Sequence, residues 1–199
     1  MMLSEVTPVP DAALPLEAFK AHLRLGTGFG EEELQDSVLI GFLRAALAAI
    51  EKRTRKALLQ RDFLWQLSQW PRPDVAQVPI APIAALTALV KVSATGSFSA
   101  LAVSDFWLEI DSQSPRLHPR GSCLPDLEEG GHVEVTLSAG FAASWDGVPA
   151  DLAQAVLMLA AHFYEYRNDT GLHGGCMPFG VASLIERYRP LRLSMRTGS

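Results

Sequence analysis

Residue types that could carry catalysis are few and scattered in this chain. The two available Cys–His combinations are Cys176 with His173 and Cys123 with His118. A thiol becomes a nucleophile only beside a base and in surroundings that lower its pKa, and no local motif supplies either condition. The G-x-S-x-G turn typical of one large class of serine hydrolases is absent. We therefore predict that the protein is not an enzyme and keep a small Cys–His enzyme only as a rival hypothesis.

Metal and phosphate chemistry are also poorly supported. The segment His173-Gly174-Gly175-Cys176 offers two of the four ligands that a structural zinc site requires, and no second pair completes it. The glycines of residues 26–30 lack the Lys-Ser/Thr of a phosphate-binding loop, and three glutamates follow them directly. We expect no metal site and no cofactor.

A basic C-terminal segment is the most asymmetric charge feature. Residues 186–199 contain Glu186 and four arginines, a net charge of +3, so the remainder carries −8 of the chain's total of −5. Such a segment is either a solvated terminus or a dock for an acidic protein surface, where guanidinium groups pair with carboxylates. The residues that would form the dock are Arg187, Arg189, Leu191, Arg192, Leu193 and Arg196.

Composition limits the function classes further. The chain has 199 residues, of which 48% are hydrophobic and 20% charged. This composition favours a folded protein over a disordered one, and the acidic balance disfavours a general DNA-coating role. The longest apolar runs, residues 38–50 and 152–164, are interrupted by polar side chains and are too short for a bilayer. The N-terminus lacks a signal-peptide pattern, so we expect a cytosolic protein with reduced thiols.

The hydrophobic periodicity predicts an α+β fold with two long and two shorter helices. Apolar residues at helical spacing indicate helices over residues 14–25, 31–55, 149–167 and 179–188. Between them, alternating patterns indicate strands near residues 63–67, 86–92, 106–110 and 132–137, with short antiparallel connections. We divide the chain into an N-terminal arm (1–14), a main domain (15–190) and a tail (191–199). Within the main domain, residues 15–57 and 149–189 are helical and residues 58–140 form a β-rich insertion.

Five stretches in this order carry a family resemblance. They are LEAFKAHLRL at 16–25, AALAAIEKRT at 45–54, WQLSQWP at 65–71, VEVTLSAGF at 133–141, and VPADLAQAV at 148–156 leading to FYEYR at 163–167. Together they resemble the head–tail connector (head-completion adaptor) proteins of long-tailed phages and phage-derived gene transfer agents. One departure is that Arg55 follows Thr54, where the family commonly has a helix-ending glycine.

The resemblance implies a structural role. Family members form a ring, usually of twelve copies, on the portal, extend the DNA channel and dock the next neck or tail protein. It implies that the tail residues contact the portal and that the long helices supply subunit contacts, for which our candidates are Phe42, Ala46, Ala49, Glu165 and Arg167. DNA would pass without specific binding, and no membrane is involved. The protein would reside in the host cytoplasm during assembly and then in the particle neck.

Two alternatives remain at this stage. Within the same class, the protein could be a stopper or tail-completion neck protein. In a different class, the arginine-rich tail could make it a nucleic-acid-binding module, whose affinity would fall steeply with salt.

Overall fold

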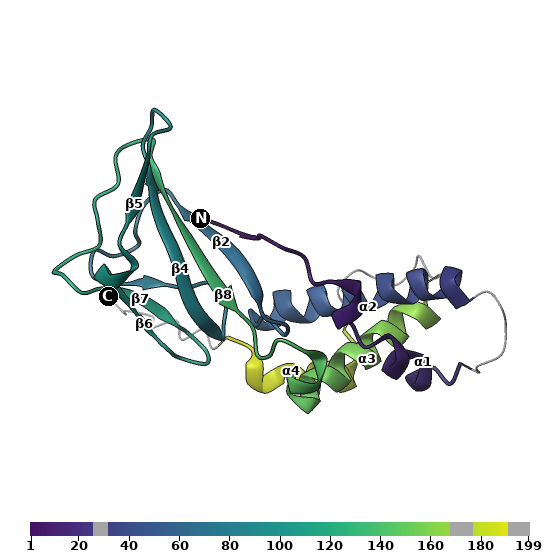
Figure 1. Ribbon diagram of the computed structural model, residues 1–199. Coiled ribbons are helices and arrows are strands. Elements are labelled where there is room, and N and C mark those ends of the chain that lie inside the picture. The colour runs from purple at the N-terminus through teal and green to yellow at the C-terminus, as the bar shows by residue number, and fades with distance from the viewer. Residues whose placement is uncertain (26–31, 168–176, 191–199) are drawn as a thin grey trace.

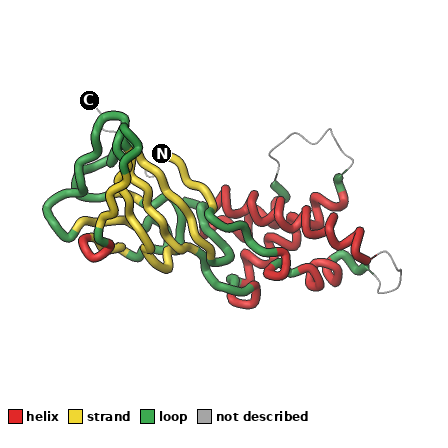
Figure 2. The backbone as a smooth tube through the Cα atoms, turned by 45° about the horizontal axis from the view of Figure 1, so that its top comes forward, coloured by secondary structure: helices red, strands yellow, loops and turns green. Residues whose placement is uncertain are grey.

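The computed structural model describes residues 1–25, 32–167 and 177–190. Helices gather at one end of the molecule and strands at the other (Figures 1 and 2). Each half has its own hydrophobic core. The chain enters the β-rich half after the second helix and returns for the third, as the predicted insertion requires.

The helical half contains α1 (Leu16–His22), α2 (Glu32–Thr54), α3 (Ala150–Glu165) and α4 (Phe179–Ile185), followed by a 3₁₀ turn (Glu186–Tyr188). The two long and two shorter helices confirm the predicted inventory. Their apolar stripes converge on a core whose fully buried members include Phe19, Leu39, Leu43, Ile50, Leu152 and Ile185. Pro149 precedes α3 directly, as expected of a residue that cannot donate an intrahelical hydrogen bond.

The end of α2 shows how the chain manages without the family's glycine. Arg55 adopts φ +56°, a left-handed conformation that glycine reaches at less strain. Its N–H donates to Glu51 O at 2.7 Å, while the Thr54 hydroxyl donates to Ile50 O at 2.8 Å and accepts from Lys56 N–H at 3.2 Å. The helix therefore ends at Thr54, one residue before its predicted end.

The larger sheet has five antiparallel strands in the order β1-β2-β8-β4-β5. They are β1 (Met2–Glu5), β2 (Arg61–Leu67), β8 (His132–Ala139), β4 (Ile83–Val92) and β5 (Phe98–Leu101). Alternation is strict in β2 and β8, where every second side chain is buried. The N-terminal arm contributes a strand that the sequence pattern did not predict, because residues 2–5 pair with β2 and form one edge of this sheet.

A smaller sheet of β3 (Ala76–Gln77), β7 (Arg116–Pro119) and β6 (Phe106–Glu109) completes the β-rich half, in the order β3-β7-β6. Between the two sheets lies a core whose largest member is Trp65, with no exposed surface. Leu117 and Phe106 enter it from the smaller sheet. The predicted strand at residues 106–110 thus belongs to a second layer, while those near residues 63–67, 86–92 and 132–137 are neighbours in the first.

Candidate functional site: the assembly surfaces

The segment that leads into the C-terminal tail is anchored to the start of α3. Tyr188 is buried, and its hydroxyl donates to Asp151 Oδ1 at 2.8 Å. Arg187 Nη2 lies 2.8 Å from Asp151 Oδ2. Gln113, from the loop between β6 and β7, donates to Arg187 O at 3.1 Å. The chain therefore reaches Pro190 from a position fixed by both halves of the molecule.

Electrostatics reinforce this anchor. Burial raises the pKa of the Tyr188 hydroxyl, so the group that donates to Asp151 stays protonated further into the alkaline range. The pKa of Arg187 is raised first by its hydrogen bond with the Tyr188 hydroxyl and then by the nearby Asp151 carboxylate. These contacts place Asp151 at the centre of the anchor, a role that the sequence did not reveal.

The structure separates the predicted portal-contact residues into two groups. Arg187 pairs with Asp151 and Arg189 with Glu186, the latter at 2.9 Å, so both charges already have partners within the chain. Their side chains remain 69% and 48% exposed, which leaves surface for a further contact. The other predicted residues lie outside the described part of the chain: Leu191, Arg192, Leu193 and Arg196.

The predicted subunit-contact residues partly form a cluster on α2 and α3. Phe42 meets Tyr164 edge-to-face at 5.9 Å, and the Arg167 guanidinium lies 4.7 Å from the centre of the same ring. Glu165 and Arg167 are exposed, while Phe42 and Ala49 are half-buried. Ala46 is completely buried in the helical core, so it offers no surface to a neighbouring copy and the prediction for this residue is wrong.

An ion-pair network joins the two halves at the base of β2. Arg61 is 8% exposed, yet its Nη2 lies 2.7 Å from Glu51 Oε2 and 2.6 Å from Glu5 Oε1. The guanidinium also donates to Leu59 O at 3.0 Å and lies over the Phe63 ring. Because these partners come from α2, β1 and β2, Arg61 fixes the N-terminal strand and the helical half to the same point.

Lys56 forms a second buried link between the halves. Its side chain is 2% exposed and donates to Ser112 O in the loop between β6 and β7. Burial lowers the pKa of its ammonium group, with the Asp111 carboxylate acting in the opposite direction. The loop is itself ordered by Asp111, whose carboxylate accepts from the N–H groups of Gln113 and Ser114 at 2.7 and 2.6 Å.

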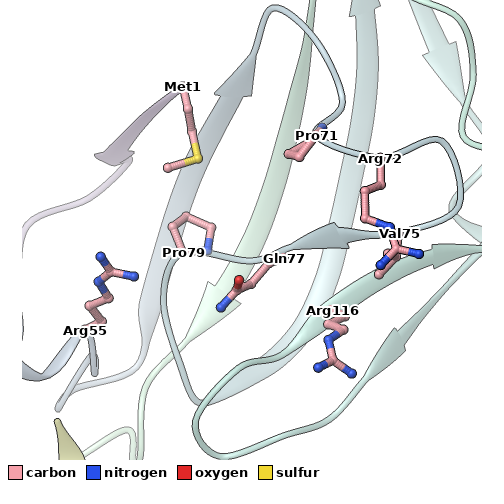
Figure 3. A pocket seen from close by; sticks show the side chains of 8 residues that line it. All are labelled: Met1, Arg55, Pro71, Arg72, Val75, Gln77, Pro79 and Arg116. Atoms are coloured by element: carbon pink, nitrogen blue, oxygen red, sulfur yellow. The ribbon is translucent and has the colours of Figure 1, made fainter. Parts of the chain in front are cut away.

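Three arginines surround a shallow pocket of about 350 Å³ at the open side between the sheets (Figure 3). Arg72 pairs with Asp74 and Arg116 with Glu109, so both charges are compensated. Arg55 has no carboxylate partner among the described residues. Since the remaining lining is mainly Met, Pro and Val, the pocket suits a mixed protein surface better than a small-molecule substrate.

Residues considered for catalysis are not gathered into a catalytic arrangement in the described part of the chain. His118 stacks on Trp107 at 4.3 Å and lies 2.8 Å from Glu109 Oε2, while Cys123 is exposed. His173 and Cys176 lie outside the described residues. The described ranges contain no group of three His, Cys, Asp or Glu residues that could hold a metal, and none of their helices is long and apolar enough to cross a membrane.

Exposed apolar side chains mark surfaces that sequence reasoning missed. Apart from the N-terminal Met1, the most exposed large ones are Phe179 at 89%, Ile110 at 78% and Phe98 at 74%. Phe98 is the first residue of β5 and Ile110 directly follows β6, two short strands in which sequence alternation extends over too few residues to assign a face. Singly exposed apolar side chains are common on protein surfaces, so these three gain weight only where another feature of the surface accompanies them.

Comparison with solved structures finds close similarity over nearly the whole chain. Two chains share 49% identity: one in the neck of an empty GTA particle computed with C6 symmetry, with a TM-score of 0.88, and one in the virion of a native gene transfer agent (GTA) particle, at 0.84. A third, in the neck of a native GTA particle computed with C12 symmetry, is 46% identical with a TM-score of 0.83. Each match covers 97% of both chains. No family model and no curated protein sequence matches the chain.

Proposed function

The chain belongs to the head–tail connector family of long-tailed phages and phage-like gene transfer agents, and from that membership we propose that it forms a ring on the portal, extends the DNA channel and docks the next neck protein. Its general role is that of a structural protein of the particle neck that assembles as a ring. The observation that carries the proposal is 49% identity over 97% of both chains to a neck chain.

The anchored C-terminus supports a portal-facing role. Tyr188 and Arg187 fix the chain to Asp151, so whatever follows Pro190 leaves from a defined point on every copy in a ring. A repeated portal surface would then meet the same basic segment at each position. Arg192 and Arg196, which have no counter-charge within residues 186–199 other than Glu186, are the proposed contacts.

The charge distribution supports passage of DNA without retention. Residues 1–185 carry −8 against +3 for the rest. A channel wall of the same sign as the phosphate backbone would suppress binding along its length. We propose that the protein has no catalytic activity and uses no cofactor, in keeping with its relatives in particle necks.

A truncation tests the portal contact. Removing residues 191–199 spares the Asp151 anchor, so the shortened chain should fold normally. We expect it to lose binding to purified portal rings in sedimentation assays and to be missing from particles. The control replaces Arg72, an exposed arginine already paired with Asp74, by alanine and should bind as the wild type does.

Particle imaging and DNA-binding measurements on the full-length and truncated chains separate the connector from its alternatives. A truncated chain that still occupies the portal would overturn the tail assignment. Wild-type density below the connector layer, instead of on the portal, would identify a stopper or tail-completion protein. Steeply salt-dependent DNA binding that disappears on truncation would identify a nucleic-acid-binding module.

A further inference from the structure

Both edges of the five-stranded sheet are unpaired among the described residues. β1 forms one edge and β5 the other (Figure 1). An unpaired edge presents a row of N–H and C=O groups that can pair with another strand. Exposed apolar side chains accompany both edges, with Met2 56% exposed on β1 and Phe98 74% exposed on β5.

The direction of the two edges is fixed by the strand count. Each of the four neighbouring pairs in the order β1-β2-β8-β4-β5 is antiparallel. Four reversals return the chain to its first direction, so β1 and β5 run parallel. When copies are related by a rotation, as in a ring, β5 of one copy can meet β1 of the next only as a parallel pair. A ring needs two different complementary faces on each copy, and the two edges are such faces.

The backbone groups that β1 leaves free follow from one hydrogen bond. Val6 N–H donates to Asp62 O at 2.9 Å, directly after the register pairs Glu5 with Phe63. Because bonded and non-bonded pairs alternate in an antiparallel ladder, Ser4 and Met2 bond to β2. The N–H and C=O groups of Leu3 and Glu5 therefore point away from the sheet.

The same reasoning applies to β5. Ser93 N–H donates to Ser97 O at 2.9 Å, at the turn next to the pair of Val92 with Phe98. By alternation, Ser99 and Leu101 bond to β4, and the backbone groups of Phe98 and Ala100 point outward.

The sheet faces on which these outward-pointing residues lie are those that a parallel pairing of β1 with β5 requires. Leu3 lies opposite the buried Trp65 and packs against the inner core, so the outward residues of β1 are on the inner face. Leu101 lies opposite the buried Leu89, so the outward residues of β5, Phe98 and Ala100, are on the other face. In a parallel ladder, a residue bonds to the two residues that flank its opposite number. If the inner faces of two neighbouring sheets are to stay on the same side, the outward-pointing residues of β1 must lie on one face and those of β5 on the other. Leu3 and Phe98 meet this condition.

We propose that β1 of each copy pairs in parallel with β5 of the next copy, which joins the sheets into one continuous ring. Placing Leu3 opposite the neighbouring copy's Ser99 aligns all four residues of each strand. Leu3 N–H then donates to Phe98 O, and Ala100 N–H donates to Leu3 O. This register also brings Met2 beside Phe98 on the outer face, where two exposed apolar side chains cover one another.

This inference rests on the proposed ring-forming function. It names the interface that closes the ring, which neither the candidate helix residues nor the tail supplies. The partner is a second copy of this chain, because the two edge strands match one another. They run in the same direction, have the same length, and point their free backbone groups outward from residues that a parallel pair can join.

Crosslinking tests the register directly. Ser4 and Ala100 would lie opposite one another, so the variant Ser4→Cys with Ala100→Cys is made in a chain whose Cys123 and Cys176 are replaced by serine. We expect mild oxidation of assembled particles to give a ladder of covalent multimers on a non-reducing gel. Either single-cysteine variant should stop at dimers.

A proline variant provides a second measurement. Ala100→Pro removes an N–H that points away from β4, and proline is tolerated at such an edge position, so the monomer should keep its melting temperature. Losing one hydrogen bond at every interface should weaken each contact about tenfold. Ala100→Val keeps the N–H and is the matched control, with ring formation close to wild type.

The outcomes separate this inference from the proposed function. Normal neck occupancy without a ladder, together with normal rings of the Ala100→Pro variant, would overturn the edge pairing and leave the connector role intact. Absence of the wild-type chain from the neck would overturn the connector role. In that case, the ladder is measured on the purified chain at high concentration, where its presence supports the edge pairing and its absence overturns it.

Discussion

The Arg61 guanidinium lies 2.7 Å from the Glu51 carboxylate at the point where the helical half meets the β-rich half. Their side chains are 6% and 12% exposed, so each charge depends on the other for compensation. Glu5 adds a third charge from the N-terminal strand. One network therefore couples the orientation of the two halves to the position of β1.

Replacing Arg61 by alanine should strongly destabilise the protein. Removing one member of a buried ion pair leaves an uncompensated charge, which costs about 3–5 kcal/mol. Urea denaturation should show this loss in the free energy of unfolding. Arg72→Ala is the control, because the Arg72–Asp74 pair is exposed and should contribute less than about 1 kcal/mol. Similar losses in the two variants would contradict a coupling role for Arg61.

Asp151→Asn should loosen the C-terminal anchor without unfolding the helical core. The amide keeps a hydrogen-bond acceptor for Tyr188 but loses the charge that faces Arg187 at 2.8 Å. We expect a small decrease in melting temperature and faster cleavage by trypsin after Arg187. Asp146→Asn, in the 3₁₀ turn before α3, is the control and should leave the cleavage rate unchanged. Equal protection in both variants would show that the ion pair is not needed for anchoring.

Much of the fold could be predicted from the periodicity of apolar residues in the sequence. The apolar spacing after Pro149 predicts α3, and the alternation from His132 to Leu137 predicts β8, because each element has one buried face along its length. The C-terminal anchor is harder to predict from the sequence, since Asp151 and Tyr188 meet only after α3 and α4 pack. Their spacing along the chain carries no local signal.

The N-terminal strand and the left-handed Arg55 show a different limit. Met2–Glu5 becomes a strand because β2 offers it an edge and Arg61 holds Glu5, conditions that lie far along the chain. Arg55 stands where the family resemblance predicts a glycine, and hydrogen bonds from the Thr54 hydroxyl and from Arg55 N–H to Glu51 O determine where α2 ends. Local propensity alone cannot predict either outcome, because tertiary contacts decide it.

Acidification should weaken the loop between β6 and β7. Hydrogen bonds from Ser114 and Gln113 N–H lower the pKa of the Asp111 carboxyl below its usual range. A lowered pKa means that the unfolded chain takes up the proton first, so stability is present above the usual aspartate pKa of about 4 and is lost as pH falls through the folded value. Free energies of unfolding at several pH values should therefore fall below about pH 4. Asp111→Asn should flatten part of this dependence, whereas Asp126→Asn in an exposed loop should not; identical profiles would refute the assignment.

Lys56 should add a second rise in stability with pH, in the alkaline range. Burial lowers its pKa, so the folded protein releases this proton before the unfolded chain does. Stability attributable to Lys56 should then rise as pH increases from the folded value toward the ordinary lysine pKa of about 10.4. Lys56→Met should remove that rise, as followed by urea denaturation between neutral and alkaline pH. Lys52→Met, at an exposed position on α2, is the matched control. A rise that survives in Lys56→Met would assign the effect to another group.

Gly140→Ala should disrupt the exit from β8. Gly140 has φ +146°, and a Cβ atom built there would lie 2.4 Å from the Gln60 backbone N and Cα. Neither atom can move without displacing the start of β2, so we expect a loss of several kcal/mol, the range seen for severe overpacking and backbone strain. Gly121→Ala is the control, because no atom lies within 4 Å of its Cβ position. Chemical denaturation of both variants measures the difference, and a Gly140→Ala protein as stable as Gly121→Ala would show that β2 and β8 can separate here without penalty.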